Sequence, residues 1–127
     1  MRRLAILGSM GILIPISACG SGGQQAPKQP SADEQIRAVI HQGIDAWNRG
    51  DADAFASTYC AKKRERRVDE LTAAGVSPLK VEEVTIGQVT ISGDKAEAEV
   101  TLTHKDRDAD IETFPMVHEG GRWKMCD

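Results

Sequence analysis

The side chains of this chain whose types could carry out chemistry are its histidines, serines and cysteines, and their spacing decides what they can do. The three histidines stand far apart, and none has a second ligand at the spacing of a metal site: His41, His104 and His118. We therefore expect ordinary surface or rim histidines and no metal ion. The sequence has no Gly-x-Ser-x-Gly motif and no glycine-rich loop leading into a helix, so we expect no serine nucleophile and no cofactor.

The first cysteine follows a short apolar segment. The chain begins with two arginines and continues with an apolar run over residues 4–16, which is too short to cross a bilayer with room to spare. This is the pattern of a secretory signal peptide. Its end, Ile16-Ser17-Ala18-Cys19, resembles the bacterial lipobox, in which a branched apolar residue and two small residues precede the cysteine that receives the lipid.

That resemblance implies a lipoprotein. We expect residues 1–18 to be removed as a signal peptide and Cys19 to carry diacylglycerol and palmitate, which would hold the protein on the extracytoplasmic side of the cell membrane. The alternative is an ordinary signal peptide cut after Ala18, which leaves a free thiol. Residues 20–30 contain glycine, glutamine and proline but no large apolar side chain, so residues 19–30 are predicted to be a lipidated cysteine followed by a flexible tether.

Charge and composition exclude some functions for the remaining domain, residues 31–127. Removing the signal peptide changes the formal net charge from −3 to −5, because Arg2 and Arg3 leave with it. A net-acidic chain argues against binding of nucleic acid, which needs a basic surface. All the aromatic residues follow residue 46, so we expect the core there: Trp47, Phe55, Tyr59, Phe114 and Trp123.

Helical patterns fill the first half of the domain. A capping box at Ser31 precedes a stripe of apolar residues at helical spacing, and Gly50 is placed to end that helix. Asp51 can cap a second, shorter helix that is predicted to end at Cys60. A third helix is predicted over residues 61–74, with most of its side chains facing solvent.

From residue 79 onward the apolar period changes to two, which is typical of strands. A slip of one position at Gly87 indicates a β-bulge in the first strand. The predicted strands cover residues 84–91, 96–103, 111–118 and 122–126. The sequence thus predicts an α+β fold in which three N-terminal helices pack on an antiparallel sheet of four strands.

This order of elements resembles the nuclear transport factor 2-like superfamily, in which a curved sheet wraps a long N-terminal helix into a cone. Residues 46–60 resemble its helix-turn-helix joint, the bulged strand lies where its sheet must bend, and residues 119–127 resemble its closing hairpin with an inward tryptophan. The chain looks closest to small exported lipoproteins of this fold from actinobacteria. The resemblance implies a curved, cone-shaped domain over residues 31–127.

The other two cysteines form an even pair once Cys19 is lipidated. Because we expect the chain in an oxidising compartment, we predict a disulfide between Cys60 and Cys126 that ties the helical layer to the edge of the sheet. Two buried free thiols or a redox pair are the alternatives, although the Cys-x-x-Cys spacing of redox proteins is absent.

The same superfamily includes ketosteroid isomerases and polyketide cyclases, which use an inward carboxylate as a base and a tyrosine or a protonated acid as its partner. Here Glu97 and Glu99 alternate with apolar residues and are predicted on the wet face, while the acids of residues 106–110 fall in a charged loop. Tyr59 is the only tyrosine. With no carboxylate predicted to be buried on the inner face of the sheet, the catalytic residues of these enzymes cannot be transferred, and a small isomerase or cyclase is the alternative function.

A basic run is the last candidate site: Lys62, Lys63, Arg64, Arg66 and Arg67. Its ordinary interpretation is a solvated helix face, and the alternative is a docking patch for lipid head groups or acidic envelope polymers. Branched side chains on one strand face favour a packed interior. The sequence therefore predicts a membrane-anchored, non-catalytic module that binds a small apolar ligand or a protein partner, with a homodimer through the outer face of the sheet as one form of the latter.

Overall fold

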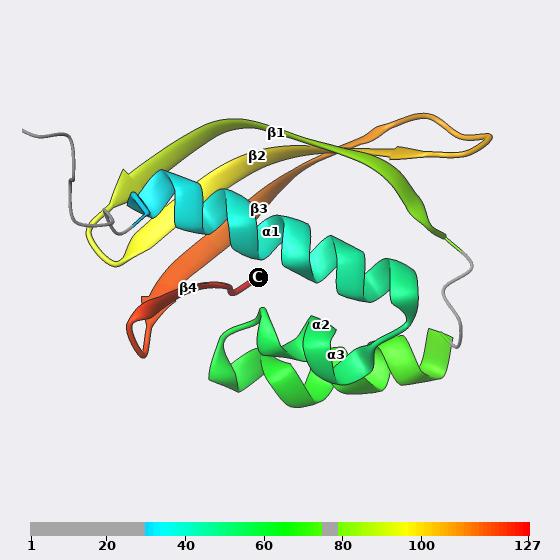
Figure 1. Ribbon diagram of the computed structural model, residues 1–127, viewed down its shortest axis with the longest axis horizontal. Helices are drawn as coiled ribbons and strands as arrows, with labels where there is room; N and C mark the ends of the chain where they lie inside the picture. The colour runs from blue at the N-terminus through cyan, green and yellow to red at the C-terminus, as the bar shows by residue number, and fades with distance from the viewer. Residues whose placement is uncertain (1–29, 75–78) are drawn as a thin grey trace, which may run out of the picture.

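The fold is seen in a computed structural model that describes residues 30–74 and 79–127. Within these ranges it has the helices α1 (Ala32–Arg49), α2 (Ala52–Ser57) and α3 (Ala61–Ala74), and the strands β1 (Val81–Ser92), β2 (Lys95–His104), β3 (Asp110–Glu119) and β4 (Arg122–Met125). The strands form one antiparallel meander in chain order. In Figure 1 the sheet curves over α1, with α2 and α3 on the side away from β1. This is the predicted α+β architecture.

The predicted signal peptide, Cys19 and all but the last residue of the tether lie outside the described residues. Among the helices that are described, none is both long enough and apolar enough to cross a membrane.

Helix α1 begins and ends where its capping residues predict. The Ser31 hydroxyl accepts a hydrogen bond from the Glu34 N–H at 3.2 Å, and the Glu34 carboxylate accepts one from the Ser31 N–H at 3.3 Å. Gly50 ends the helix with a φ of +68°, a backbone conformation that glycine adopts at little cost. The apolar stripe of α1 is buried against the sheet, with Ile36 and Ile40 fully inaccessible to solvent.

Gly43 lets α1 approach β4 and the end of α2 closely. A Cβ atom at this position would lie 2.5 Å from Met125 Cε and 3.0 Å from Thr58 Oγ1. Both neighbours would have to move to admit even a methyl group. The glycine therefore sets how tightly the helical layer closes on the last strand.

The sheet follows the predicted alternation in β2, where Ala96, Ala98, Val100 and Leu102 are all buried. The predicted bulge is confirmed, because the pairing of β1 with β2 shifts register between Ile86 and Val89. The closing tryptophan, Trp123, points inward as expected and is 6 % exposed. The interior is thus lined on one side by β2 and closed at one end by β4.

Two predicted element ends are wrong: that of the second helix, and that of the last strand, which ends at Met125, one residue before Cys126. Helix α2 ends at Ser57, so Cys60 lies in the link between α2 and α3 rather than at the end of a helix. The link runs beside β4: Tyr59 bridges to Met125, and the Cys60 N–H donates to the Met125 carbonyl at 2.8 Å. Residues 58–60 can either continue the helix or pair with β4, and here they pair with β4. The spacing of apolar residues does not distinguish these two outcomes.

Candidate functional site

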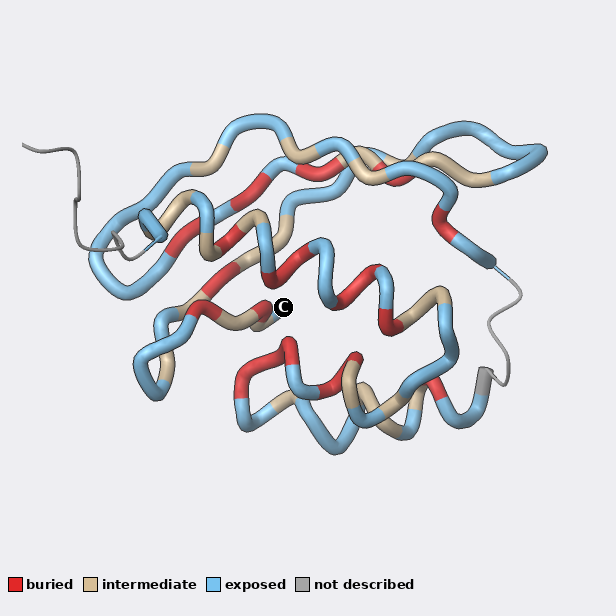
Figure 2. Tube along the Cα trace, in the orientation of Figure 1, coloured by how far each residue is buried: buried red, intermediate tan, exposed pale blue. Residues whose placement is uncertain are grey.

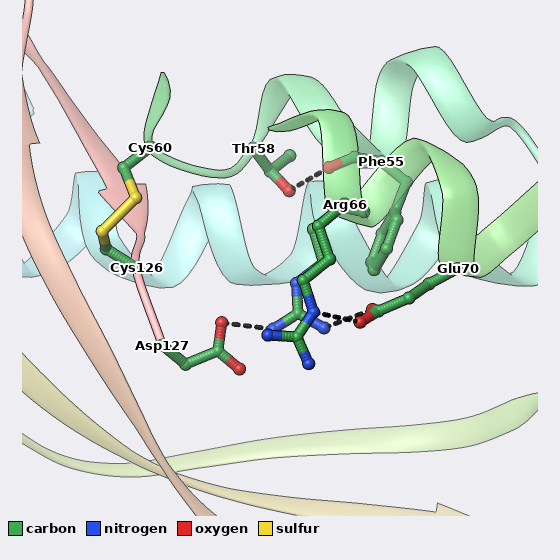
Figure 3. Close-up of polar contacts among 8 residues, drawn as sticks. Phe55, Thr58, Cys60, Arg66, Glu70, Cys126 and Asp127 are labelled. Carbon is green, nitrogen blue, oxygen red and sulfur yellow. Dashed lines mark hydrogen bonds and ion pairs between the residues drawn. A yellow bond between two sulfur atoms is a disulfide. The ribbon is translucent and has the colours of Figure 1, made fainter. Parts of the chain in front are cut away.

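Cys60 and Cys126 are joined by a disulfide in the structure, with their Cα atoms 5.3 Å apart (Figure 3). This is the pairing expected from the sequence. Cys60 is 1 % exposed, and the Cys126 N–H donates to the Pro115 carbonyl at 2.8 Å. The bond therefore fastens the link between α2 and α3 to the edge of the sheet where β3 and β4 meet.

Beside the disulfide lies a group of side chains that we call the Arg67 cluster: Tyr59, Arg67, Glu70 and Asp127. Arg67 Nη1 donates to Glu70 Oε2 at 2.6 Å, and Arg67 Nη2 donates to the carboxylate of Asp127. The guanidinium carbon of Arg67 lies 4.5 Å from the centre of the Tyr59 ring, within the range of a cation–π contact. Figure 3 shows Glu70 and Asp127 converging from α3 and from the residue after the disulfide.

The Arg67 cluster changes the interpretation of the basic run. The side chain of Arg67 is only 16 % exposed, so it belongs to the interior rather than to a docking patch. Arg66 also donates to Glu70, at 2.9 Å. Lys62 and Arg64 remain exposed near the start of α3, with Lys63 half-buried between them. The structure therefore divides the run into an exposed first part and a second part whose charges are paired.

Burial raises the pKa of Tyr59 to about 12, and the positive charge of Arg67 offsets only part of that increase. The phenol is therefore neutral near neutral pH. It can donate a hydrogen bond but cannot serve as a base. A neutral, buried phenol of this kind is the type of group that stabilises an oxyanion in isomerases.

We expect Tyr59 to titrate at a pH near its raised pKa of about 12 instead of near 10. Because the folded protein binds the phenolic proton more tightly than the unfolded chain, its stability should fall as the pH rises from 10 to 12, by about 2–3 kcal/mol in all. As this is the only tyrosine in the chain, the ultraviolet absorbance of phenolate reports it alone. Tyr59→Phe is the control for both signals, and a midpoint near pH 10 in the folded protein would contradict the burial.

Two carboxylates face the inner side of the sheet, where the sequence predicts no buried carboxylate. Glu112 pairs with Val100 and Asp110 pairs with Leu102, and residues directly opposite in a ladder share a face. Neither is buried, since Thr58 is the only buried polar residue in the described ranges. The alternation signal fails in β3 because apolar side chains occur on both of its faces.

His104 is more enclosed than a rim histidine, with a side chain that is 8 % exposed. Its Nδ1 lies 3.1 Å from the Lys80 carbonyl oxygen and its Nε2 lies 3.2 Å from Asp110 Oδ2. Asp110 also accepts from Arg107, at 3.0 Å. These contacts fix the end of β2 to the start of β1 and to β3, and they occupy both ring nitrogens.

The other two histidines are closer to expectation. His41 is exposed on α1, and the His118 ring packs against the Trp123 ring with centroids 5.2 Å apart. In the part of the chain that the structure describes, no group of three or more histidine, cysteine or acidic side chains is placed to hold a metal ion.

The interior of the cone is filled by side chains from all layers. Leu71 of α3, Tyr59 of the link and Val100 of β2 belong to one buried cluster, and none of them is more than 8 % exposed. Figure 2 shows buried positions along α1, in the link and along β2.

Hollows occur instead on the surface. One, which we call the outer groove, has a volume of about 470 Å³ and is lined by residues that include Lys62, Lys95, Pro115 and Val117. A second lies between α1 and β4, has a volume of about 320 Å³ and includes Gln35, Arg122 and Lys124. Both are open rather than enclosed, and both adjoin the exposed part of the basic run or the hairpin next to it.

Comparison with known proteins identifies the fold. No protein-family model matches the sequence, and no curated protein sequence is significantly similar to it. Solved structures do match. A protein of unknown function from Shewanella baltica, described as NTF2-like, has a TM-score of 0.57 at 11 % identity, with 77 % of this chain and 92 % of that chain covered.

Two further structures agree. A Campylobacter jejuni protein described provisionally as an NTF2-like transpeptidase has a TM-score of 0.52 at 14 % identity, covering 72 % of this chain and 97 % of that chain. A de novo designed NTF2-fold protein has a TM-score of 0.51 at 15 % identity, covering 79 % and 87 %. The chain therefore has the nuclear transport factor 2-like fold. Likeness at such identities defines the fold and leaves activity open.

Proposed function

We propose that this protein is a lipid-anchored, extracytoplasmic module that binds a protein partner without catalysing a reaction. The anchor rests on the lipobox-like sequence ending at Cys19. The non-catalytic role is supported by the filled interior, the buried cluster between the helices and the sheet to which Leu71, Tyr59 and Val100 belong. The filled interior is the observation that carries the proposal.

The absence of a desolvated base in the described residues supports the same conclusion. A carboxylate that removes a proton near neutral pH needs burial to raise its pKa. Glu112 faces the inner side of the sheet but is exposed to solvent, and Asp110 is held by His104 and Arg107. Neither meets that requirement.

A partner would therefore dock on the surface, and the outer face of the sheet offers a mostly polar one. Threonines and glutamates alternate along its strands, including Thr90, Glu97 and Thr113, with Ile111 as an isolated exposed apolar residue at 73 %. Such a face favours hydrogen bonding over the large apolar burial of an obligate homodimer. We therefore prefer a different protein to a second copy as the partner.

A small enzyme of the isomerase or cyclase kind is the alternative. Tyr59 is held neutral by its burial, and Glu112 faces the same inner space from β3. Together they provide an oxyanion donor and an acid of the types that such enzymes use. The exposure of Glu112 and the filling between the sheet and α3 make this the second choice.

Native mass spectrometry of the protein purified from membranes in mild detergent tests both parts of the proposal. We expect a covalent mass for a chain starting at Cys19 with its lipid and lacking two hydrogens for the disulfide. Any additional mass that is held non-covalently should be that of a partner protein. No small ligand should be retained. Cys19→Ser is the control and should leave the protein unlipidated and uncut. A lipid-free chain starting at Cys19 would contradict the anchor, and a retained small molecule would contradict the filled interior.

A further inference from the structure

The fold brings basic side chains from two distant segments to one corner of the domain. Arg64 of α3 and Arg122 of β4 lie close enough to Lys124 of β4 to act on its charge. Lys62 lies in the same first turn of α3 as Arg64 and lines the neighbouring outer groove. We call these four residues the basic corner. Lys124 Nζ donates to the Ser57 carbonyl at 2.6 Å, which places its charge beside the link that leads into α3.

Like charges are held close together in the basic corner. The pKa of Lys124 is lowered, first by partial burial and then by the positive charges of Arg64 and Arg122. The neighbouring carboxylate, Glu119, accepts a hydrogen bond from the Ala61 N–H at 3.0 Å and so lies at the first turn of α3. One carboxylate does not neutralise four cations. An external anion would relieve their repulsion.

The position of the basic corner indicates where that anion comes from. Arg122 and Lys124 share the hollow beside α1 with Gln35, which lies one turn after the start of the helix. In Figure 1 the start of α1 and the hairpin joining β3 to β4 lie at the same end of the domain. This is the end at which the chain enters from Cys19.

The length of chain before α1 keeps this end near the anchor. Twelve positions separate Cys19 from Ser31. If they are flexible, as their glycine- and glutamine-rich composition predicts, their mean end-to-end distance is about 20 Å. The rest of the mature chain is net acidic, so an anionic surface repels it as a whole and attracts the basic corner.

We propose that the basic corner binds the phosphate groups of anionic phospholipids in the membrane that holds the anchor, and so orients the domain with this end toward the bilayer. This inference rests on the anchoring proposed above. The lipid at Cys19 then supplies attachment, and Lys62, Arg64, Arg122 and Lys124 supply orientation. Each basic residue near an anionic bilayer contributes ~1 kcal/mol, enough together to favour one orientation of a tethered domain.

Lysine acetylation of the mature lipidated protein in nanodiscs tests the proposal. The discs contain phosphatidylcholine alone or phosphatidylcholine with phosphatidylglycerol, and mass spectrometry gives the labelling rate of each lysine. We expect the rates of Lys62 and Lys124 to fall by about fivefold in the anionic discs, in line with stabilisation on the order of 1 kcal/mol. Lys80 and Lys105, exposed at the other end of α1, should react equally in both discs.

The double variant Arg64→Glu/Arg122→Glu should abolish the protection of Lys124, while the matched double variant Lys80→Glu/Lys105→Glu should leave it intact. Equal labelling in neutral and anionic discs, with the protein retained on both, would overturn the basic corner alone. Failure of the protein to stay on any disc would overturn the anchor instead. Inorganic phosphate that protects Lys62 and Lys124 equally well in neutral discs would show a free-anion site and overturn the assignment to lipid.

Discussion

Reduction of the Cys60–Cys126 disulfide is expected to lower the free energy of unfolding by about 4 kcal/mol. The bond closes a loop with a sequence separation of 66, and in the chain-entropy model a loop of that length removes about this much entropy from the unfolded state. A small domain has only ~5–15 kcal/mol of stability in all. Urea unfolding of the oxidised and reduced protein, followed by tryptophan fluorescence, measures the difference.

The double variant Cys60→Ser/Cys126→Ser is the control for this experiment. It should unfold at the same urea concentration with or without reductant, and close to the midpoint of the reduced wild-type protein. A wild-type midpoint that does not move on reduction would contradict the prediction, because a disulfide that closes this loop must restrict the unfolded chain.

Leu71→Ala is expected to cost about 2–5 kcal/mol, the range found when a buried leucine leaves a cavity. Leu71 is 2 % exposed and is the buried hydrophobic residue that α3 adds to the core, among the helix positions whose burial is described. Its loss removes the contact that packs α3 over the interior. Thermal and urea unfolding of the oxidised protein give the change.

Thr72→Ala is a matched control, because the next residue of the same helix is exposed. It should change stability by no more than about 0.5 kcal/mol. If Leu71→Ala were equally mild, α3 would not pack on the core in solution, and the interior assigned above as filled would be open to a ligand.

The sequence predicts those parts of the fold that depend on a single local pattern. The capping box at Ser31, the glycine after α1 and the strict alternation of β2 each correspond to a single physical requirement, and each was placed correctly. The bulge at Gly87 was predicted for the same reason, since a slip of phase in a strand has few other causes.

The candidate site was predicted less well because its residues are specified by tertiary contacts. Arg67 sits in a basic run, and only the approach of Asp127 and Tyr59 shows that it turns inward. Glu112 lies in a strand with apolar residues on both faces, so alternation could not orient it. Arg122 and Lys124 are not recognisable as part of a basic cluster until β4 is seen to pair with the link that leads into α3. Residue patterns predict which face of a helix or strand is buried. They do not predict which distant segments come into contact.

The disulfide divides the chain into two parts that would respond differently to a pulling force. Residues 60–126 form a covalently closed ring that contains α3 and the whole sheet, while α1 and α2 lie outside it, on the side of the chain that leads toward Cys19. Tension applied at residue 31 would therefore peel α1 away from the sheet, and the extension would stop at the ring. A domain pulled at residue 31 would yield first in α1 and α2, while the disulfide would prevent residues 60–126 from being drawn out into an extended chain.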